Sequence, residues 1–88
     1  MNHTSRLQEI TRSILDYVLT KSDLDSIDEI PLEESLLSTG VLDSFGIIEL
    51  VEFIESAYLL VIPDEDFSVE NFGTVTRIAA YIDSRLPV

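Results

Sequence analysis

The sequence predicts an all-α fold, a small four-helix bundle with three long helices, one short helix and a long loop after the first helix. Three stretches place apolar residues at helical spacing, near residues 7–18, 47–58 and 75–86. One further apolar run, at 59–62, could be mistaken for a strand, but no second run could pair with it. Because 88 residues build one small core, we expect a single domain that spans residues 1–88.

The first helix is expected from Ser5 to about Thr20. Gln8 follows Ser5 by three residues, which is the spacing of a capping box. The apolar face of this helix comprises Leu7, Ile10, Ile14 and Val18, and it could extend to Leu15 and Leu19.

A long acidic connection should follow, from residue 21 to residue 43. Pro31 interrupts it, and a turn of helix is plausible near residues 32–37. Gly40 should supply a turn that residues with a Cβ atom resist. Because loops this long are uncommon in compact domains, we expect apolar side chains to pin the connection to the core. The candidates are Ile27, Ile30, Leu32, Leu36, Leu37, Val41 and Leu42.

The second helix is expected from Ser44 to about Tyr58, with Asp43 or Ser44 as its N-cap. In either case the Ser44 hydroxyl should lie on the surface at a helix N-terminus, where another protein can reach it. The predicted core residues of this helix are Ile47, Leu50, Val51, Phe53, Ile54 and Tyr58. An acidic stripe beside them consists of Glu49, Glu52 and Glu55.

After the second helix, the run at 59–62 is expected to tuck into the core as an extended segment. Pro63 stops it, and an acidic turn follows at 64–67. Ser68 should cap a short helix that Gly73 ends. Phe67 and Phe72 are expected to pin this helix to the bundle.

The last helix should begin at its cap, Thr74. Its inner face is expected to comprise Val75, Ile78, Ala79, Ile82 and Leu86.

The charge of the chain narrows the classes of partner. Lys and Arg number 5 against 17 Asp and Glu, which gives a net charge of −12. Such a surface repels nucleic-acid phosphates and anionic lipid headgroups, and it attracts proteins with basic patches. No apolar run approaches the length of a membrane span, and the N-terminal residues do not read as a signal peptide. We therefore expect a cytoplasmic monomer without a membrane span.

The sequence does not predict an enzyme or a metal site. The single histidine is His3, at a terminus expected to fray, so no base accompanies Ser44. The chain has no cysteine and therefore neither a thiol of its own nor a zinc site of the usual kind. The segment from Asp64 begins like a calcium-binding EF-hand loop, but Val69 stands where glycine is required and Val75 where glutamate is required. We expect no metal site.

Several motifs together resemble those of the acyl carrier protein family. They are Gly40-Val41-Leu42-Asp43-Ser44-Phe45 with the acidic helix behind it, Val61-Ile62-Pro63-Asp64, Glu70-Asn71-Phe72, and the spaced Val75, Ile78, Tyr81 and Ile82. The resemblance extends from the first helix to Leu86. It implies a four-helix bundle that carries covalent 4′-phosphopantetheine on Ser44, the serine of the Asp43-Ser44 dipeptide. In this family the thiol of the arm, and not the protein, holds the cargo as a thioester.

The variant Asp43-Ser44-Phe45-Gly46 departs from the Asp-Ser-Leu-Asp of fatty-acid carriers. It is closer to D-alanyl and other stand-alone aminoacyl carriers. The resemblance implies three kinds of partner: a phosphopantetheinyl transferase, an AMP-forming acyl or aminoacyl ligase, and acyl-transferring enzymes with basic patches. The cargo stays open among fatty acyl, aminoacyl, D-alanyl and polyketide groups, in fatty-acid or secondary-metabolite biosynthesis.

The predicted partner-binding residues are Phe45, Ile48, Glu49, Glu52 and Glu55. Each has a simpler interpretation. The two apolar residues could belong to the core, and the glutamates could form an ordinary solvated face. A second functional class also stays open, in which the chain is an acidic helical adaptor that binds a basic protein and carries no prosthetic group.

Overall fold

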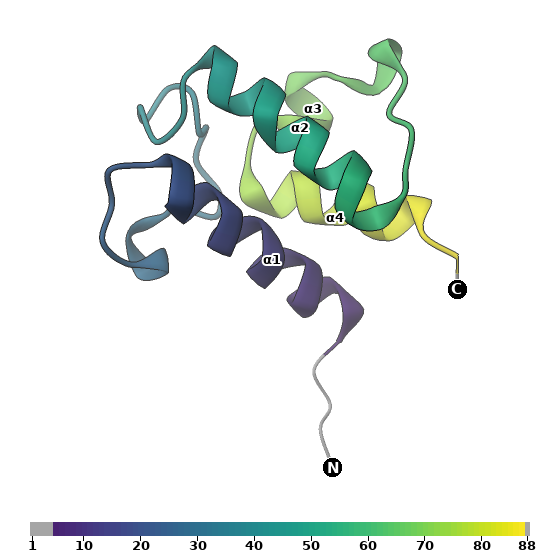
Figure 1. The fold of residues 1–88 in the computed structure, drawn as a ribbon, viewed down its shortest axis with the longest axis horizontal. Coiled ribbons are helices and arrows are strands. Elements are labelled where there is room, and N and C mark those ends of the chain that lie inside the picture. The colour runs from purple at the N-terminus through teal and green to yellow at the C-terminus, as the bar shows by residue number, and fades with distance from the viewer. Residues whose placement is uncertain (1–4, 88) are drawn as a thin grey trace.

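A computed structural model describes residues 5–87 of the chain. Within that range it contains helices and turns but no strand, so the all-α prediction is confirmed (Figure 1). The elements in order are α1 (Arg6–Lys21), the 3-10 turn η1 (Ile27–Glu29), α2 (Ser44–Tyr58), the 3-10 turn η2 (Asp64–Asp66), α3 (Val69–Phe72) and α4 (Val75–Arg85).

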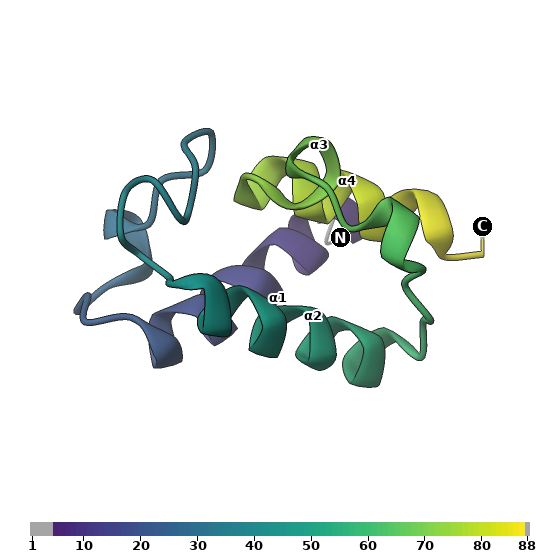
Figure 2. The ribbon, with the colours of Figure 1, turned by 90° about the horizontal axis from the view of Figure 1, so that it is seen from above.

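In Figure 2, α2 lies in one layer and α3 and α4 lie in the other, while α1 runs obliquely from the level of α2 at its C-terminal end to that of α4 at its N-terminal end. The helix α4 packs extensively against α1 and also against the short α3. The side chains buried between these layers are almost all aliphatic, as the helical periodicity predicted. They include Ile10, Ile14, Val18, Ile47, Leu50, Ile54, Phe72, Val75, Ile78, Ala79, Tyr81 and Ile82.

Every expected capping group of the α-helices is present. Ser5 and Gln8 form the predicted capping box of α1. The hydroxyl of Ser68 accepts from the amide of Asn71, and Thr74 does the same for Arg77 at the start of α4. These short-range contacts explain why the helix starts could be predicted from local sequence.

The long connection between α1 and α2 is pinned to the bundle at fewer points than expected. Ile30, Leu36 and Leu42 are buried, whereas Leu32 and Leu37 are 43% and 50% exposed. The expected helical turn at 32–37 is absent, and the single helical turn of the connection is η1, further upstream.

Backbone hydrogen bonds hold the connection in place. The amide of Leu36 donates to the carbonyl of Gly73 at 3.2 Å, and the amide of Thr76 donates to the carbonyl of Leu32 at 3.1 Å. Gly40 has φ +78° and makes the predicted turn before α2. The loop therefore closes one end of the bundle and sets the direction in which α2 begins.

Two predictions of burial were wrong, for different reasons. Leu7 is 43% exposed, since the first turn of α1 extends past the core. In the run at 59–62 only Ile62 is buried, while Leu59 and Val61 are 89% and 78% exposed. Leu59 ends α2 in a left-handed conformation with φ 53°, which swings its side chain into solvent.

Gly73 ends α3 as predicted, but for a different reason. Its φ of −73° is open to any residue, so no left-handed turn is involved. A Cβ atom at this position would lie 2.5 Å from the carbonyl oxygen of Val69. Gly73 is therefore required by the close approach of the backbone.

Candidate functional site

The start of α2 is built around the side chain of Asp43. Its carboxylate accepts a hydrogen bond of 2.7 Å from the amide of Gly46, which makes Asp43, and not Ser44, the N-cap. Gly46 is buried, and a Cβ atom there would lie 3.3 Å from a methyl group of Leu42 and 3.4 Å from the Asp43 carboxylate. A glycine at this position thus allows the cap to close tightly.

Ser44 is the first residue of α2, and its side chain is exposed. Because Asp43 already serves as the cap, the Ser44 hydroxyl is free of that structural task. Asp43 is also committed to the amide of Gly46, which makes it a poor base for the hydroxyl. His3 lies outside the described residues. The structure therefore presents an exposed hydroxyl at the first position of α2.

The two apolar residues on the exposed side of α2 do not belong to the core. Phe45 is 67% exposed and Ile48 is 49% exposed. Both follow closely after Ser44, so a protein that reached the hydroxyl would meet them. Because both side chains are exposed, they are not ordinary core residues.

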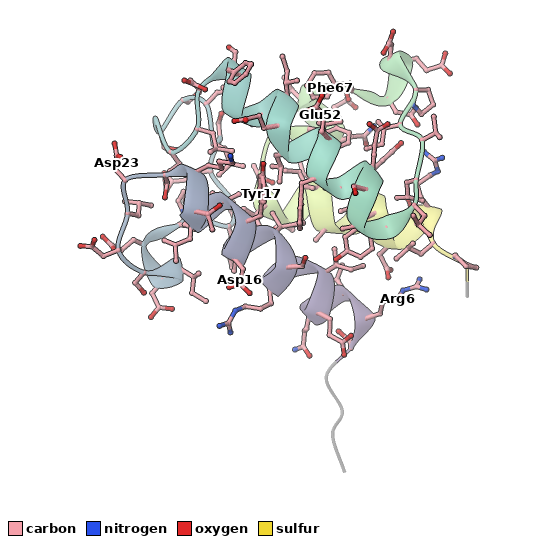
Figure 3. The ribbon with its side chains drawn as sticks, in the orientation of Figure 1. Arg6, Asp16, Tyr17, Asp23, Glu52 and Phe67 are labelled. Atoms are coloured by element: carbon pink, nitrogen blue, oxygen red, sulfur yellow. The ribbon has the colours of Figure 1, made fainter. Side chains whose placement is uncertain are left out.

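The three glutamates of the acidic stripe have different surroundings. Glu49 lies 3.7 Å from the ammonium group of Lys21, at the end of α1. Glu55 accepts a hydrogen bond of 2.9 Å from the amide of Ile62 and so holds the turn after α2. Glu52 is exposed, and no ion pair or side-chain hydrogen bond engages it among the residues described (Figure 3). Only Glu52 therefore presents an uncommitted charge.

Two depressions flank the first turns of α2. The larger, called the cleft below, has a volume of about 390 Å³ and lies between the end of α1, the connection and α2. Its lining includes Lys21, Ser22, Asp23, Leu24, Thr39, Gly40, Val41, Leu42, Asp43, Phe45, Gly46 and Glu49.

The smaller depression, called the groove below, has a volume of about 200 Å³ and lies between α2 and α3. Its walls are mostly apolar and include Leu37, Ile47, Phe67, Val69 and Phe72. Phe72 is buried as predicted, while Phe67 is 45% exposed and meets Phe72 edge-on at 5.5 Å between ring centroids.

A polar network that joins α4 to η2 and to the segment before it was not predicted from the sequence. The hydroxyl of Tyr81 donates to Asp66 at 2.7 Å, and Arg85 donates to the same hydroxyl at 2.6 Å and to the carbonyl of Val61 at 3.1 Å. Burial, followed by the hydrogen bond to Asp66, raises the pKa of Tyr81, although Arg85 opposes the shift. The spacing of Tyr81 and Arg85 on one helical face was the available signal.

The structure also shows an aromatic contact between α1 and α2 that the sequence did not indicate. Tyr17, labelled in Figure 3, stacks on Phe53 with their ring centroids 4.3 Å apart. Both rings are partly buried, and the contact fixes how α2 lies against α1.

Among residues 5–87 there is no cluster of three or more metal-ligating side chains. Nor does any described helix combine the length and the apolar character needed to cross a bilayer.

Comparisons with known proteins agree with the motif. No family model matches the chain. Similar curated proteins from Streptococcus pyogenes serotypes M5 (strain Manfredo), M49 (strain NZ131) and M1 are each named D-alanyl carrier protein. Each is 35% identical over 52 residues, which cover 59% of this chain and 66%, just under two thirds, of the relative. The resemblance inferred from the sequence is thereby confirmed, and the shared name describes a carrier rather than an enzyme.

Proposed function

We propose that this chain, a relative of the D-alanyl carrier proteins, is itself a carrier that holds an acyl or aminoacyl cargo on Ser44 through a 4′-phosphopantetheine arm. The observation that carries the proposal is the exposed Ser44 hydroxyl at the first position of α2, directly after the Asp43 cap. A D-alanyl group is the cargo named for the relatives, and a small aminoacyl group is the cargo we favour here.

The residues present suit the chemistry of this arm. A phosphodiester on Ser44 would lie at the N-terminus of a 15-residue helix, where the helix dipole and free amides favour negative charge. When bound, the arm supplies a thiol, which this cysteine-free chain does not have. The chain's own contribution is to expose the hydroxyl and to hold it rigidly through the Asp43 cap.

The surface around Ser44 suits the expected partners. A phosphopantetheinyl transferase must supply the base that activates Ser44, because no base in the described chain accompanies it. An AMP-forming ligase and the acyl-transferring enzymes would then dock on the same side of α2. Phe45 and Ile48 offer them apolar contacts, and Glu52 offers a charge for a basic patch.

Loading of the purified chain tests the proposal directly. Incubation with coenzyme A and a transferase should increase the intact mass by one phosphopantetheinyl group. Ser44→Ala should abolish this gain, while the control Ser56→Ala, which removes another exposed hydroxyl of α2, should be loaded normally.

Ser44→Ala should also leave the fold intact. Since Asp43 is the cap, the loss of free energy of unfolding should stay within about 0.5 kcal/mol, as for other surface substitutions. Loading of Ser44→Ala, or the absence of loading in the unchanged chain, would contradict the proposal. The second result would favour the acidic adaptor without a prosthetic group.

A further inference from the structure

We propose that the cleft between the end of α1 and the start of α2 holds the arm against the protein, with Lys21 contacting its phosphate and apolar walls contacting its pantoyl part. This inference rests on the carrier function proposed for Ser44. It concerns where the arm lies between encounters with partner enzymes.

The first observation is the position of the cleft. Asp43 and Phe45, the residues directly before and after Ser44, both line it. Ser44 itself is exposed and is not part of the lining. An arm attached to Ser44 would therefore begin at the edge of the cleft and could fold into it.

The second observation is the charge of the lining. The chain has five Lys and Arg residues in all, and Lys21 is the one that lines this cleft. Asp23, Asp43 and Glu49 also line the cleft and are acidic, so Lys21 is the lining residue that can attract a phosphate. Asp23 lies on the loop that follows α1, at the outer edge of this end of the molecule (Figure 3). Lys21 is thus the residue of the lining that we expect to meet the phosphate attached to Ser44.

The third observation is that Lys21 is available. Its ammonium group lies 3.7 Å from Glu49, and both side chains keep about a third of their surface exposed, at 37% and 33%. An exposed pair at this separation contributes little stability. The ammonium group also lies 5.7 Å from the ring centroid of Tyr17. Lys21 can therefore exchange Glu49 for a phosphate at small cost.

The fourth observation is the contrast with the groove. The cleft, at about 390 Å³, falls within the size range of ligand pockets, whereas the groove, at about 200 Å³, falls below it. The arm combines a phosphate, a hydroxyl and two amides with one pair of geminal methyl groups. Leu24 and Val41 offer apolar contact for the methyl groups beside polar neighbours, whereas the groove is mostly apolar.

Nuclear Overhauser contacts in the loaded protein test the inference. After the mass confirms loading, the pantoyl methyl protons should show contacts to the side chains of Leu24 and Val41. Lys21→Gln should weaken or remove these contacts. Arg77→Gln, a matched loss of one positive charge at an exposed position outside the cleft lining, should leave them unchanged.

The outcomes separate this inference from the carrier function. A loaded protein without contacts to Leu24 and Val41, or with contacts only to Leu37 and Val69 of the groove, overturns the inference and leaves the carrier function standing. Equal contacts in the unchanged protein and in Lys21→Gln overturn the role of Lys21. A chain that gains no mass with coenzyme A and a transferase overturns the carrier function, and the inference with it.

Discussion

At the scale of single residues, the three glutamates of α2 differ in the contacts that they make. Sequence spacing made Glu49, Glu52 and Glu55 equivalent members of one stripe. In the fold Glu49 faces Lys21 and Glu55 holds the amide of Ile62, so both are engaged within the chain. Docking of a basic partner should therefore depend most on Glu52.

Charge reversal at Glu52 should slow the association of a basic partner. Glu52→Lys should reduce the association rate with a phosphopantetheinyl transferase at low salt, and the difference should shrink as salt screens the charges. Stopped-flow measurements at two ionic strengths, with Glu9→Lys on α1 as the control of equal charge change, provide the check. Equal rates for the two variants would show that Glu52 belongs to an ordinary solvated face.

Glu55 should contribute to the stability of the fold and not to the docking of a basic partner. Glu55→Ala leaves the amide of Ile62 without its acceptor and should lower the free energy of unfolding by about 1 kcal/mol, whereas Glu55→Gln, which keeps an acceptor, should lower it less. Urea unfolding of the two variants separates these cases. Equal free energies of unfolding in Glu55→Ala and Glu55→Gln would mean that the hydrogen bond contributes nothing.

Tyr81 should make stability depend on alkaline pH. Burial and the hydrogen bond to Asp66 raise its pKa above the usual value near 10, so the folded state favours the neutral hydroxyl. This contribution to stability is fully present below about pH 10 and is lost as the pH rises through the pKa of the folded state.

Comparison with Tyr81→Phe isolates that contribution. The difference in free energy of unfolding between the original chain and Tyr81→Phe should be constant up to about pH 9 and should then shrink. Chemical denaturation from pH 7 to pH 11 measures it. A difference that stays the same across this range would show that Tyr81 titrates alike in the folded and unfolded states.

At the scale of elements, the junction of α3 and α4 supports the whole connection between α1 and α2. The carbonyl of Gly73 accepts from the amide of Leu36, and Leu36 is fully buried. The amide of Leu42 in turn donates to the carbonyl of Leu36, one residue before the Asp43 cap. The position of α3 is thus linked to the position of Ser44 through a short series of backbone contacts.

Gly73→Ala should disturb this junction. The new Cβ atom would lie 2.5 Å from the carbonyl oxygen of Val69, so the backbone of α3 must shift, at a cost of roughly 1–3 kcal/mol. Thermal unfolding and hydrogen exchange of the Leu36 amide should both report the change. Gly40→Asn is the comparison, because Asn tolerates a positive φ and the space around Gly40 is open. Equal effects of the two substitutions would contradict the role given to the junction.

At the scale of the whole molecule, charge opposes the compact state. Among residues 5–87, four ion pairs engage Arg6, Arg12, Lys21 and Arg85, and their partly exposed positions make each of them weak. With 17 acidic residues and 5 basic ones, most carboxylates have no ion-pair partner among the described residues. Self-repulsion should therefore limit stability at neutral pH and low salt.

Added salt should raise the melting temperature. Sodium chloride shortens the Debye length to about 10 Å at 0.1 M and so screens repulsion between neighbouring carboxylates. Melts from low salt to about 0.3 M measure the effect, with sucrose at matched osmolality as the control. A melting temperature that does not rise would show that another factor limits the stability of this fold.

The features that depend on neighbours along the chain could be predicted from the sequence. Helical periodicity and the caps Ser5, Ser68 and Thr74 placed the helices, since each cap contacts an amide three residues further on. The Asp43-Ser44 motif at the head of an acidic helix, together with the motifs further along the chain, indicated a resemblance to carrier proteins.

The tertiary structure alone decided which surface residues are engaged. Lys21 meets Glu49, Tyr81 meets Asp66 and Leu36 meets Gly73 only because the fold brings distant segments together. It also exposed Leu7, Leu59 and Val61, whose apolar character alone predicted burial. The physical reason is that periodicity reports which residues share a face, whereas burial and pairing depend on what the rest of the chain places against that face.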